Sequence, residues 1–140
     1  MSSCVLCETD GGLLLHRAPR WRLIRATDTP SFPALYRVVW NAHVAELSEL
    51  SDADRHACMD VVARVERVVR DHLAPTKINL AALGNMVPHL HWHLIARFDW
   101  DSHFPAPIWA AAQREAPDQR LAALSQQLPA LDRALIDAFH

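Results

Sequence analysis

Residues 89–95 read His89-Leu90-His91-Trp92-His93-Leu94-Ile95, with a histidine at every second position and apolar residues around each one. Successive side chains of a β-strand point to opposite faces, so the three imidazoles would lie on one face and the apolar residues on the other. Given nine histidines in 140 residues, such a triplet arises by chance only about 0.04 times. The stretch therefore predicts a strand with one chemical face and one core face.

Alternating imidazoles suit two kinds of chemistry. Imidazole is the commonest metal ligand, and a neutral imidazole is also a good nucleophile toward phosphorus. A polar strand face without chemistry is the plainer alternative, but three titratable rings flanked by apolar residues need hydrogen-bond partners. From the residues alone, a metal site and covalent catalysis both stay open.

Four other segments have the composition of strands. They are rich in β-branched, aromatic or clustered apolar residues, and Gly, Pro or Asn stands near their ends. These segments are residues 13–15, 21–24, 36–40 and 77–83. The first two would form a hairpin, and the last precedes a turn at Gly84-Asn85 that would place it beside the histidine strand.

Two segments carry apolar residues at helical spacing. Residues 52–72 follow Ser51, a helix-capping residue type, and precede Pro75, so they predict a long helix. Residues 118–139 predict a C-terminal helix that is interrupted at Pro129.

Residues 99–109 hold two prolines and three aromatic residues and predict an irregular loop. The aromatic side chains would either stack on a base or anchor the loop, and we favour anchoring. Arg97, just before this loop, would either meet a phosphate or form an ion pair with Asp99 or Asp101.

The cysteines suggest a metal or redox site near the N-terminus. Cys4 and Cys7 form a Cys-x-x-Cys pair within residues 1–12, a segment that reads as a knuckle closed by Gly11-Gly12. In a reducing cell such a pair is more typical of metal or redox chemistry than of a structural disulfide. Cys58 is expected to be a buried thiol.

Length and charge exclude several classes of protein. A chain of 140 residues is the length of one domain, so we expect residues 1–140 to form a single unit. The formal charge of −2, with no run of Lys or Arg, speaks against a nucleic-acid partner. No apolar stretch approaches the ~20 residues that span a bilayer, and the N-terminus has no secretion signal, so a cytoplasmic protein is expected.

The sequence resembles the histidine triad (HIT) family, whose signature is His-φ-His-φ-His-φ-φ with φ apolar. Residues 89–95 match that signature in full. The Cys4/Cys7 pair resembles the family's N-terminal metal-binding pair, and residues 38–43 resemble its strand that ends in a histidine, here His43. The resemblance covers roughly residues 4–109.

The resemblance implies an α+β fold, with an antiparallel sheet of about five strands, one long helix and a C-terminal helix. It implies a homodimer that cleaves a phosphoanhydride or phosphoramidate bond at the α-phosphate of a nucleotide conjugate, such as a dinucleoside polyphosphate. The reaction would pass through a nucleotidyl-histidine intermediate, with hydrolase or transferase outcome. The alternative is a nucleotide- or zinc-binding regulatory protein with little turnover.

The resemblance also assigns roles to individual residues. His91 would attack the α-phosphorus, with its Nδ1 proton held by a main-chain carbonyl, and His93 would donate to a non-bridging oxygen. Asn79 and Asn85 fall where family members contact phosphates or the leaving group, although Asn beside Gly is also an ordinary turn choice. Asp28 lies near the position that binds ribose hydroxyls, and a cap or turn role is its alternative.

The first histidine of the triad has a different implied duty. In metal-bearing members it joins the Cys pair and an upstream histidine, which here gives Cys4, Cys7, His43 and His89 as ligands of a structural Zn²⁺. The ion would hold the N-terminal knuckle beside the triad and leave His91 free to react.

Two departures from the family pattern bear on the substrate. Residues 33–35 read Pro33-Ala34-Leu35 where many members have Pro-Gly-His, and Met86 stands where a Ser or Thr often follows the Gly-Gln pair. Both changes remove groups that can protonate a leaving amine. Phosphoanhydride cleavage is therefore expected over phosphoramidate cleavage.

Overall fold

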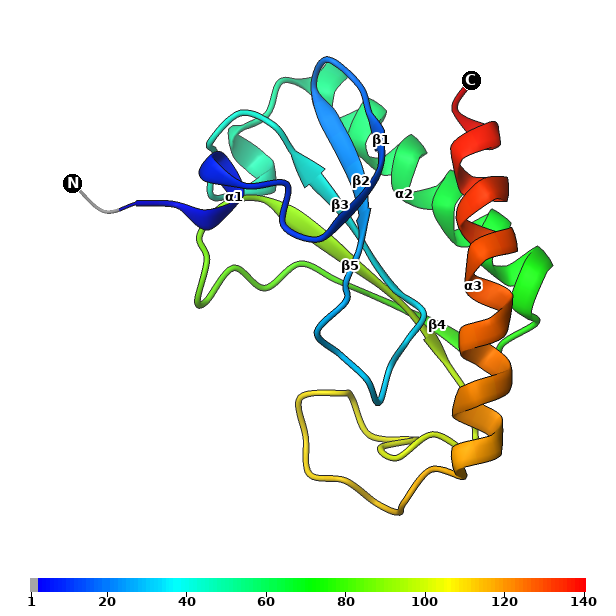
Figure 1. The fold of residues 1–140 in the computed structure, drawn as a ribbon. Coiled ribbons are helices and arrows are strands. Elements are labelled where there is room, and N and C mark those ends of the chain that lie inside the picture. The colour runs from blue at the N-terminus through cyan, green and yellow to red at the C-terminus, as the bar shows by residue number, and fades with distance from the viewer. Residues whose placement is uncertain (1–2) are drawn as a thin grey trace.

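A five-stranded antiparallel sheet forms the centre of the protein (Figure 1). The structure is a computed structural model that describes residues 3–140. The strands are β1 (Leu13–Arg17), β2 (Trp21–Arg25), β3 (Leu35–Trp40), β4 (Lys77–Ala81) and β5 (His91–Arg97), and the helices are α1 (Val5–Glu8), η1 (Leu47–Glu49), α2 (Asp52–Leu73) and α3 (Asp118–Ala138). The order across the sheet is β1-β2-β3-β5-β4. The predicted α+β fold, with five strands, a long helix and a C-terminal helix, is confirmed.

The histidine strand lies between β3 and β4, so both of its edges are hydrogen-bonded. Arg37 of β3 and Ala81 of β4 are the cross-strand partners of His93, and Val39 is the partner of His91. Side chains of paired residues lie on the same face of a sheet. His91, His93 and Arg37 therefore share one face.

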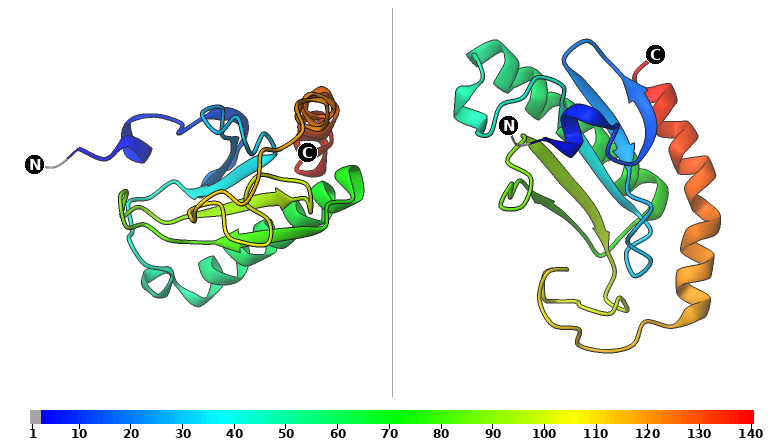
Figure 2. Two further views of the ribbon diagram at one scale, coloured as in Figure 1. Left: turned by 90° about the horizontal axis from the view of Figure 1, so that it is seen from below. Right: turned by 60° about the vertical axis from the view of Figure 1, so that its left-hand side comes forward.

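The opposite face of the sheet forms the hydrophobic core under α2 and α3. Leu23, Val38 and Leu94 point to this side and pack against apolar residues that recur along both helices. The Ser51 side chain accepts from the Asp54 backbone N–H and caps α2 as its residue type predicts. Figure 2 shows α2 on one side of the sheet and the N-terminal α1 on the other.

A buried polar group joins α3 to the sheet. Asp132 of α3 accepts a hydrogen bond of 2.8 Å from the Tyr36 hydroxyl and pairs with Arg25 at 3.0 Å. Burial and the Asp132 charge raise the pKa of Tyr36, so its hydroxyl stays a donor. The C-terminal helix is thus held by direction-specific contacts as well as by apolar packing.

Helix α3 corrects one expectation. It runs without a break from Asp118 to Ala138, although Pro129 lies inside it. Proline removes one backbone hydrogen bond, but Leu128 and Leu131 on either side are buried in the core. Tertiary packing therefore carries the helix through a position that would end an isolated one.

The ends of the two central strands also differ from the expectation. Strand β5 begins at His91 and not at His89, and β4 ends at Ala81. Pro88 has no N–H for a ladder, and the His89 N–H bonds locally to the Val87 carbonyl at 2.8 Å. The first histidine of the triplet therefore lies in a turn, and its ring takes a different direction from the other two.

The irregular segment after β5 is a long loop that leads back to α3, as predicted (Figure 1). Within residues 3–140, no helix is both long and apolar enough to cross a membrane.

Candidate functional site

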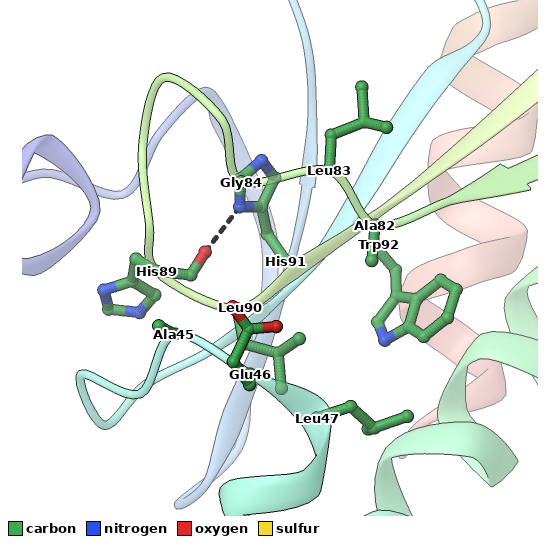
Figure 3. Close-up of a pocket in the computed structure, with 10 residues that line it drawn as sticks. All are labelled: Ala45, Glu46, Leu47, Ala82, Leu83, Gly84, His89, Leu90, His91 and Trp92. Carbon is green, nitrogen blue, oxygen red and sulfur yellow. Dashed lines mark hydrogen bonds between the residues drawn. The ribbon is translucent and has the colours of Figure 1, made fainter.

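His91 is held in one tautomer by a backbone carbonyl in the turn just before β5. Its Nδ1 lies 2.6 Å from the backbone carbonyl oxygen of His89, an acceptor only, so Nδ1 carries the proton (Figure 3). The neutral ring then has its lone pair on Nε2. Burial lowers the pKa of His91, the bond to the His89 carbonyl opposes that shift, and the positive charge of Arg37 adds to it. The net effect keeps the ring neutral and nucleophilic.

His93 lies two residues further on the same face, and its ring centroid is 5.0 Å from that of His91. Only 7% of its surface is exposed. The Nε–H of Arg37 donates to its Nδ1 at 3.2 Å. Burial and the neighbouring charges of Arg37 and His91 lower the pKa of His93 to about 4. His93 is therefore a neutral ring at physiological pH.

His91 lines two hollows at the surface. One has a volume of about 370 Å³ and is lined by residues 83–87 together with His91, His93 and Trp109. The other lies between residues 82–84 and residues 45–47 and is drawn in Figure 3, where the His91 ring and the Trp92 ring point to different sides of the strand. The ring of His91 thus borders open space and is reachable from outside the fold.

Trp109 belongs to the site and not only to the loop. Its ring meets that of His93 edge-on at 5.3 Å, and 51% of its surface is exposed. Phe104 is instead partly buried and lies against the buried Arg97, whose guanidinium carbon is 5.9 Å from the centroid of its ring. The favoured anchoring role thus fits Phe104 better than Trp109.

Arg97 holds the loop that carries Trp109. It is 2% exposed and pairs with Asp101 through Nε at 2.8 Å and Nη2 at 3.1 Å. Its remaining donors bond the Asn79 side-chain oxygen at 2.8 Å and the Ala106 carbonyl at 2.7 Å. Of the alternatives for Arg97, the structure shows the ion pair with Asp101.

The structure separates the three nucleotide-binding candidates. Asn85 is exposed and lines the cavity beside His91 and His93. Asn79 is on the same sheet face, but its side-chain oxygen accepts from Arg97 and it does not line that cavity. Asp28 is exposed in the β2–β3 loop, and its charge acts on the guanidinium of Arg37.

The four predicted metal ligands come together. One ligand atom from each of Cys4, Cys7, His43 and His89 lies within 4.8 Å of the others. The Sγ–Nδ1 distances are 3.4 Å for Cys4–His89, 3.4 Å for Cys7–His43 and 3.5 Å for Cys7–His89, and the two Nδ1 atoms are 3.2 Å apart. A tetrahedral Zn²⁺ with ordinary bond lengths places its S and N ligands ~3.6 Å apart and its two N ligands ~3.3 Å apart.

The tautomer of His89 also fits metal binding. This fully buried ring places Nε2 2.5 Å from the Trp40 carbonyl oxygen, so Nε2 carries the proton and Nδ1 presents a lone pair to the cluster. Burial lowers the pKa of His89, against the opposing effect of the Trp40 carbonyl, and this favours the neutral form that a metal requires. The donor set and its geometry therefore fit a closed four-ligand site.

The buried Arg22 fixes the knuckle that carries the cysteines. Its guanidinium donates to the Leu6 carbonyl at 2.5 Å, to the Thr9 carbonyl at 3.1 Å and to the Asp10 carbonyl at 3.0 Å. A Cβ at Gly12 would lie 2.7 Å from the Arg25 carbonyl oxygen, so the close approach of the knuckle to β2 requires glycine.

Sequence reasoning missed two residues of this site, Arg22 and Arg37, and it favoured an anchoring role for Trp109, which instead lines the cavity beside His93. Both arginines interrupt strands that otherwise consist largely of apolar residues, and a charged residue between buried neighbours is the signal that was available. Which partner each would meet depends on cross-strand register, which the pattern alone does not contain.

Comparisons with known proteins agree on one family. The family model described as HIT domain matches residues 18–100. Among solved structures, a histidine triad protein from Bradyrhizobium japonicum is 28% identical, with 91% of this chain and 92% of that chain covered and a TM-score of 0.73. No curated protein matches.

Two more distant structures show the same fold. A HIT family hydrolase from Legionella pneumophila is 17% identical, with 75% of this chain and all of that chain (100%) covered and a TM-score of 0.56. A Zn-bound histidine triad family protein from Mycobacterium smegmatis is 20% identical, with 96% and 94% covered and a TM-score of 0.58.

Proposed function

The chain belongs to the histidine triad (HIT) family, and on that premise we propose that it is a nucleotidyl hydrolase or transferase. Its substrate is a nucleotide conjugate such as a dinucleoside polyphosphate, which it cleaves at the α-phosphate. The observation that carries this proposal is the His91 ring, held with Nδ1–H on the His89 carbonyl and with Nε2 free beside an open cavity.

The reaction proceeds in two steps at His91. The Nε2 lone pair attacks the α-phosphorus, a P–N bond forms, and the P–O bond to the departing phosphate breaks with its electron pair on that oxygen. Water or another hydroxyl then attacks the same phosphorus, the P–N bond breaks, and the attacking oxygen loses its proton to solvent or to product. The His89 carbonyl stabilises the Nδ1–H of the ring as positive charge develops on it.

The residues around His91 favour a phosphoanhydride substrate. His93 is neutral and close to His91, so an N–H of its ring is placed to stabilise charge on a non-bridging oxygen. A phosphate leaving group departs as an anion without protonation. Because Leu35 and Met86 offer no proton where other family members do, this leaving group suits the site better than an amine.

The cavity beside the triad fits a nucleoside. Trp109 presents an aromatic ring next to His93, Asn85 adds a polar side chain at the rim, and Leu83 and Val87 line the rest. We assign base stacking to Trp109 and a phosphate or leaving-group contact to Asn85. Asn79 and Asp28 contribute indirectly, through Arg97 and Arg37.

The Cys4, Cys7, His43 and His89 cluster is proposed to hold a structural Zn²⁺. Bound there, the ion supplies a cross-link between the N-terminal knuckle and the turn that carries His89. Elemental analysis of the purified protein should find one zinc per chain, and Cys4→Ser should lose it. His91→Asn should retain full zinc occupancy, and loss of zinc in that variant would overturn the division of labour between His89 and His91.

A homodimer is part of the proposal. β4 is an edge strand of the sheet, and Leu80 and Leu83 at this edge are 42% and 50% exposed. Light scattering should give twice the chain mass of 15.8 kDa, and Leu80→Lys should shift the protein toward the monomer. A wild-type monomer would refute this part alone.

The decisive experiment traps the intermediate. The protein is mixed with diadenosine polyphosphate, quenched in alkali, and examined by intact-mass and peptide mass spectrometry for a nucleotidyl adduct on His91. His91→Asn should lose the adduct and all turnover, whereas His56→Asn, the same change at an exposed histidine of α2, should keep both. Turnover at the wild-type rate by His91→Asn would reject the proposal.

A further inference from the structure

Arg37 is a charged residue in a strand that is otherwise buried. Its neighbours along β3, from Leu35 to Val39, are at most 1% exposed, and Arg37 itself lies on the face that carries His91 and His93. Burying a guanidinium costs free energy unless its donors are satisfied. Arg37 is only partly buried, so any donor that the fold does not use stays open to solvent or to a ligand.

Two fully buried arginines of the sheet, Arg22 and Arg97, show what satisfied donors look like. Arg22 makes four hydrogen bonds to backbone carbonyls and to the Asn41 side chain, and Arg97 is bonded to Asp101, Asn79 and Ala106. The hydrogen-bond donors of both side chains are therefore satisfied by contacts within the fold. Each has a structural role that explains its burial.

Arg37 differs from both. Of the five N–H donors of a guanidinium, only Nε–H has a partner within residues 3–140, the Nδ1 of His93 at 3.2 Å. In the same part of the chain no carboxylate forms a salt bridge with it, although the charge of Asp28 is near enough to favour its ionised form. Both Nη groups are left with their donors unused beside the nucleophile.

The bond to His93 also determines what that ring can do. A nitrogen that accepts from a guanidinium N–H has no proton of its own, so the proton of neutral His93 is on Nε2. The result is an N–H donor on His93 and a planar fork of N–H donors on Arg37, on the same face as His91. Such a fork matches the spacing of phosphate oxygens.

We propose that Arg37 binds the substrate phosphate through its Nη groups and, through Nε–H, holds His93 as an Nε2–H donor to the same phosphate. This inference rests on the proposed function for the identity of the ligand, a nucleoside 5′-phosphate. Arg37 is thus a phosphate-binding residue and also a positioning residue for His93. The cost of its partial burial is offset when the anion binds.

The test measures binding without turnover. Titration calorimetry compares AMP with adenosine for the wild type, Arg37→Met and Arg37→Lys, with Arg67→Met on the exposed face of α2 as the matched control. Arg37→Met should weaken AMP binding by about 10- to 100-fold, as expected for hydrogen bonds to a charged group, and leave adenosine binding unchanged. Arg37→Lys should recover part of the loss, and Arg67→Met should match the wild type.

The second readout is the tautomer of His93. Nitrogen-15 NMR of the imidazole, assigned by the signal missing in His93→Asn, should show Nε2–H in the wild type and a mixture of tautomers in Arg37→Met. If Arg37→Met fails to fold, Arg37→Lys carries both comparisons, with a smaller loss of AMP affinity.

Three outcomes would overturn the inference: AMP affinity within threefold of the wild type in Arg37→Met, an equal loss for adenosine, or an unchanged His93 tautomer. Failure of the proposed function is separate from these. A wild type that binds AMP but forms no adduct on His91 rejects the proposed function and leaves the Arg37 assignment standing. A wild type that forms the adduct while Arg37→Met keeps its AMP affinity rejects Arg37 alone.

Discussion

Asp101→Asn tests the buried ion pair that supports the loop beside the triad. Asp101 is 2% exposed and accepts five hydrogen bonds. Oδ2 accepts from the Arg97 Nε and the Phe98 N–H, and Oδ1 accepts from the Arg97 Nη2 and the N–H groups of His103 and Phe104. Every one of these partners is a donor.

An asparagine cannot replace that carboxylate in either orientation. Its amide NH₂ would face two donors at the Oδ2 position or three at the Oδ1 position, and the buried Arg97 would lose its counter-charge. Breaking a buried ion pair from one side costs about 3–5 kcal/mol, so we expect the free energy of unfolding to fall by about 4 kcal/mol. With a urea m-value of about 2 kcal/mol/M, the unfolding midpoint should fall by about 2 M.

Urea denaturation followed by circular dichroism measures this loss. Asp99→Asn is the control, because it makes the same chemical change two residues away on an exposed side chain, and it should stay within about 0.5 kcal/mol of the wild type. A loss below about 1 kcal/mol in Asp101→Asn would show that the pair is not needed and would refute the reasoning.

The pH dependence gives a second check on Asp101. Burial alone would raise the pKa of this carboxyl, but hydrogen bonds from Arg97 and from the backbone of residues 98–104 lower it overall. A lowered pKa contributes stability above the ordinary value of Asp and loses it as the pH falls through the lowered pKa. The stability gap between wild type and Asp101→Asn should therefore be full at pH 7 and shrink in acid.

Three further expectations concern the site and the far face of the sheet. The ring of His93 should titrate near pH 4 by NMR, because burial and the charges of Arg37 and His91 disfavour its protonated form. The free energy of unfolding should therefore fall as the pH drops from about 6.5 toward that value. A titration midpoint above pH 6 would contradict this expectation. Asp132→Asn should lower the free energy of unfolding by about 3 kcal/mol in the same urea assay, because it removes the carboxylate that pairs with β2 and accepts from Tyr36, and a neutral result would show that apolar packing alone holds α3. A zinc chelator should speed amide hydrogen exchange in the N-terminal knuckle, and unchanged protection there would argue against a cross-linking ion.

The sequence by itself determined the features that depend on residues close together in the chain. The alternation around His91 and His93 predicted a strand with one reactive face, because side-chain direction on a strand has a period of two whatever its neighbours are. Ser51 and the apolar spacing after it located the long helix, because capping and helical periodicity also act within a few residues. The resemblance carried by residues 89–95, together with the Cys4/Cys7 pair and residues 38–43, supplied the family and the expected metal-ligand set.

Tertiary structure decided how these residues divide their work. His89 left the strand because Pro88 has no N–H and because its ring bonds the Trp40 carbonyl, and α3 ran through Pro129 because both sides of the proline are packed. Arg37 and His93 lie 56 positions apart in the sequence, and they meet only because of the register of β3 on β5. Hydrogen bonds across a sheet depend on which strands are neighbours and on the register between them. A one-residue slip would move Arg37 to the core face, so the role proposed for it is a property of the folded sheet.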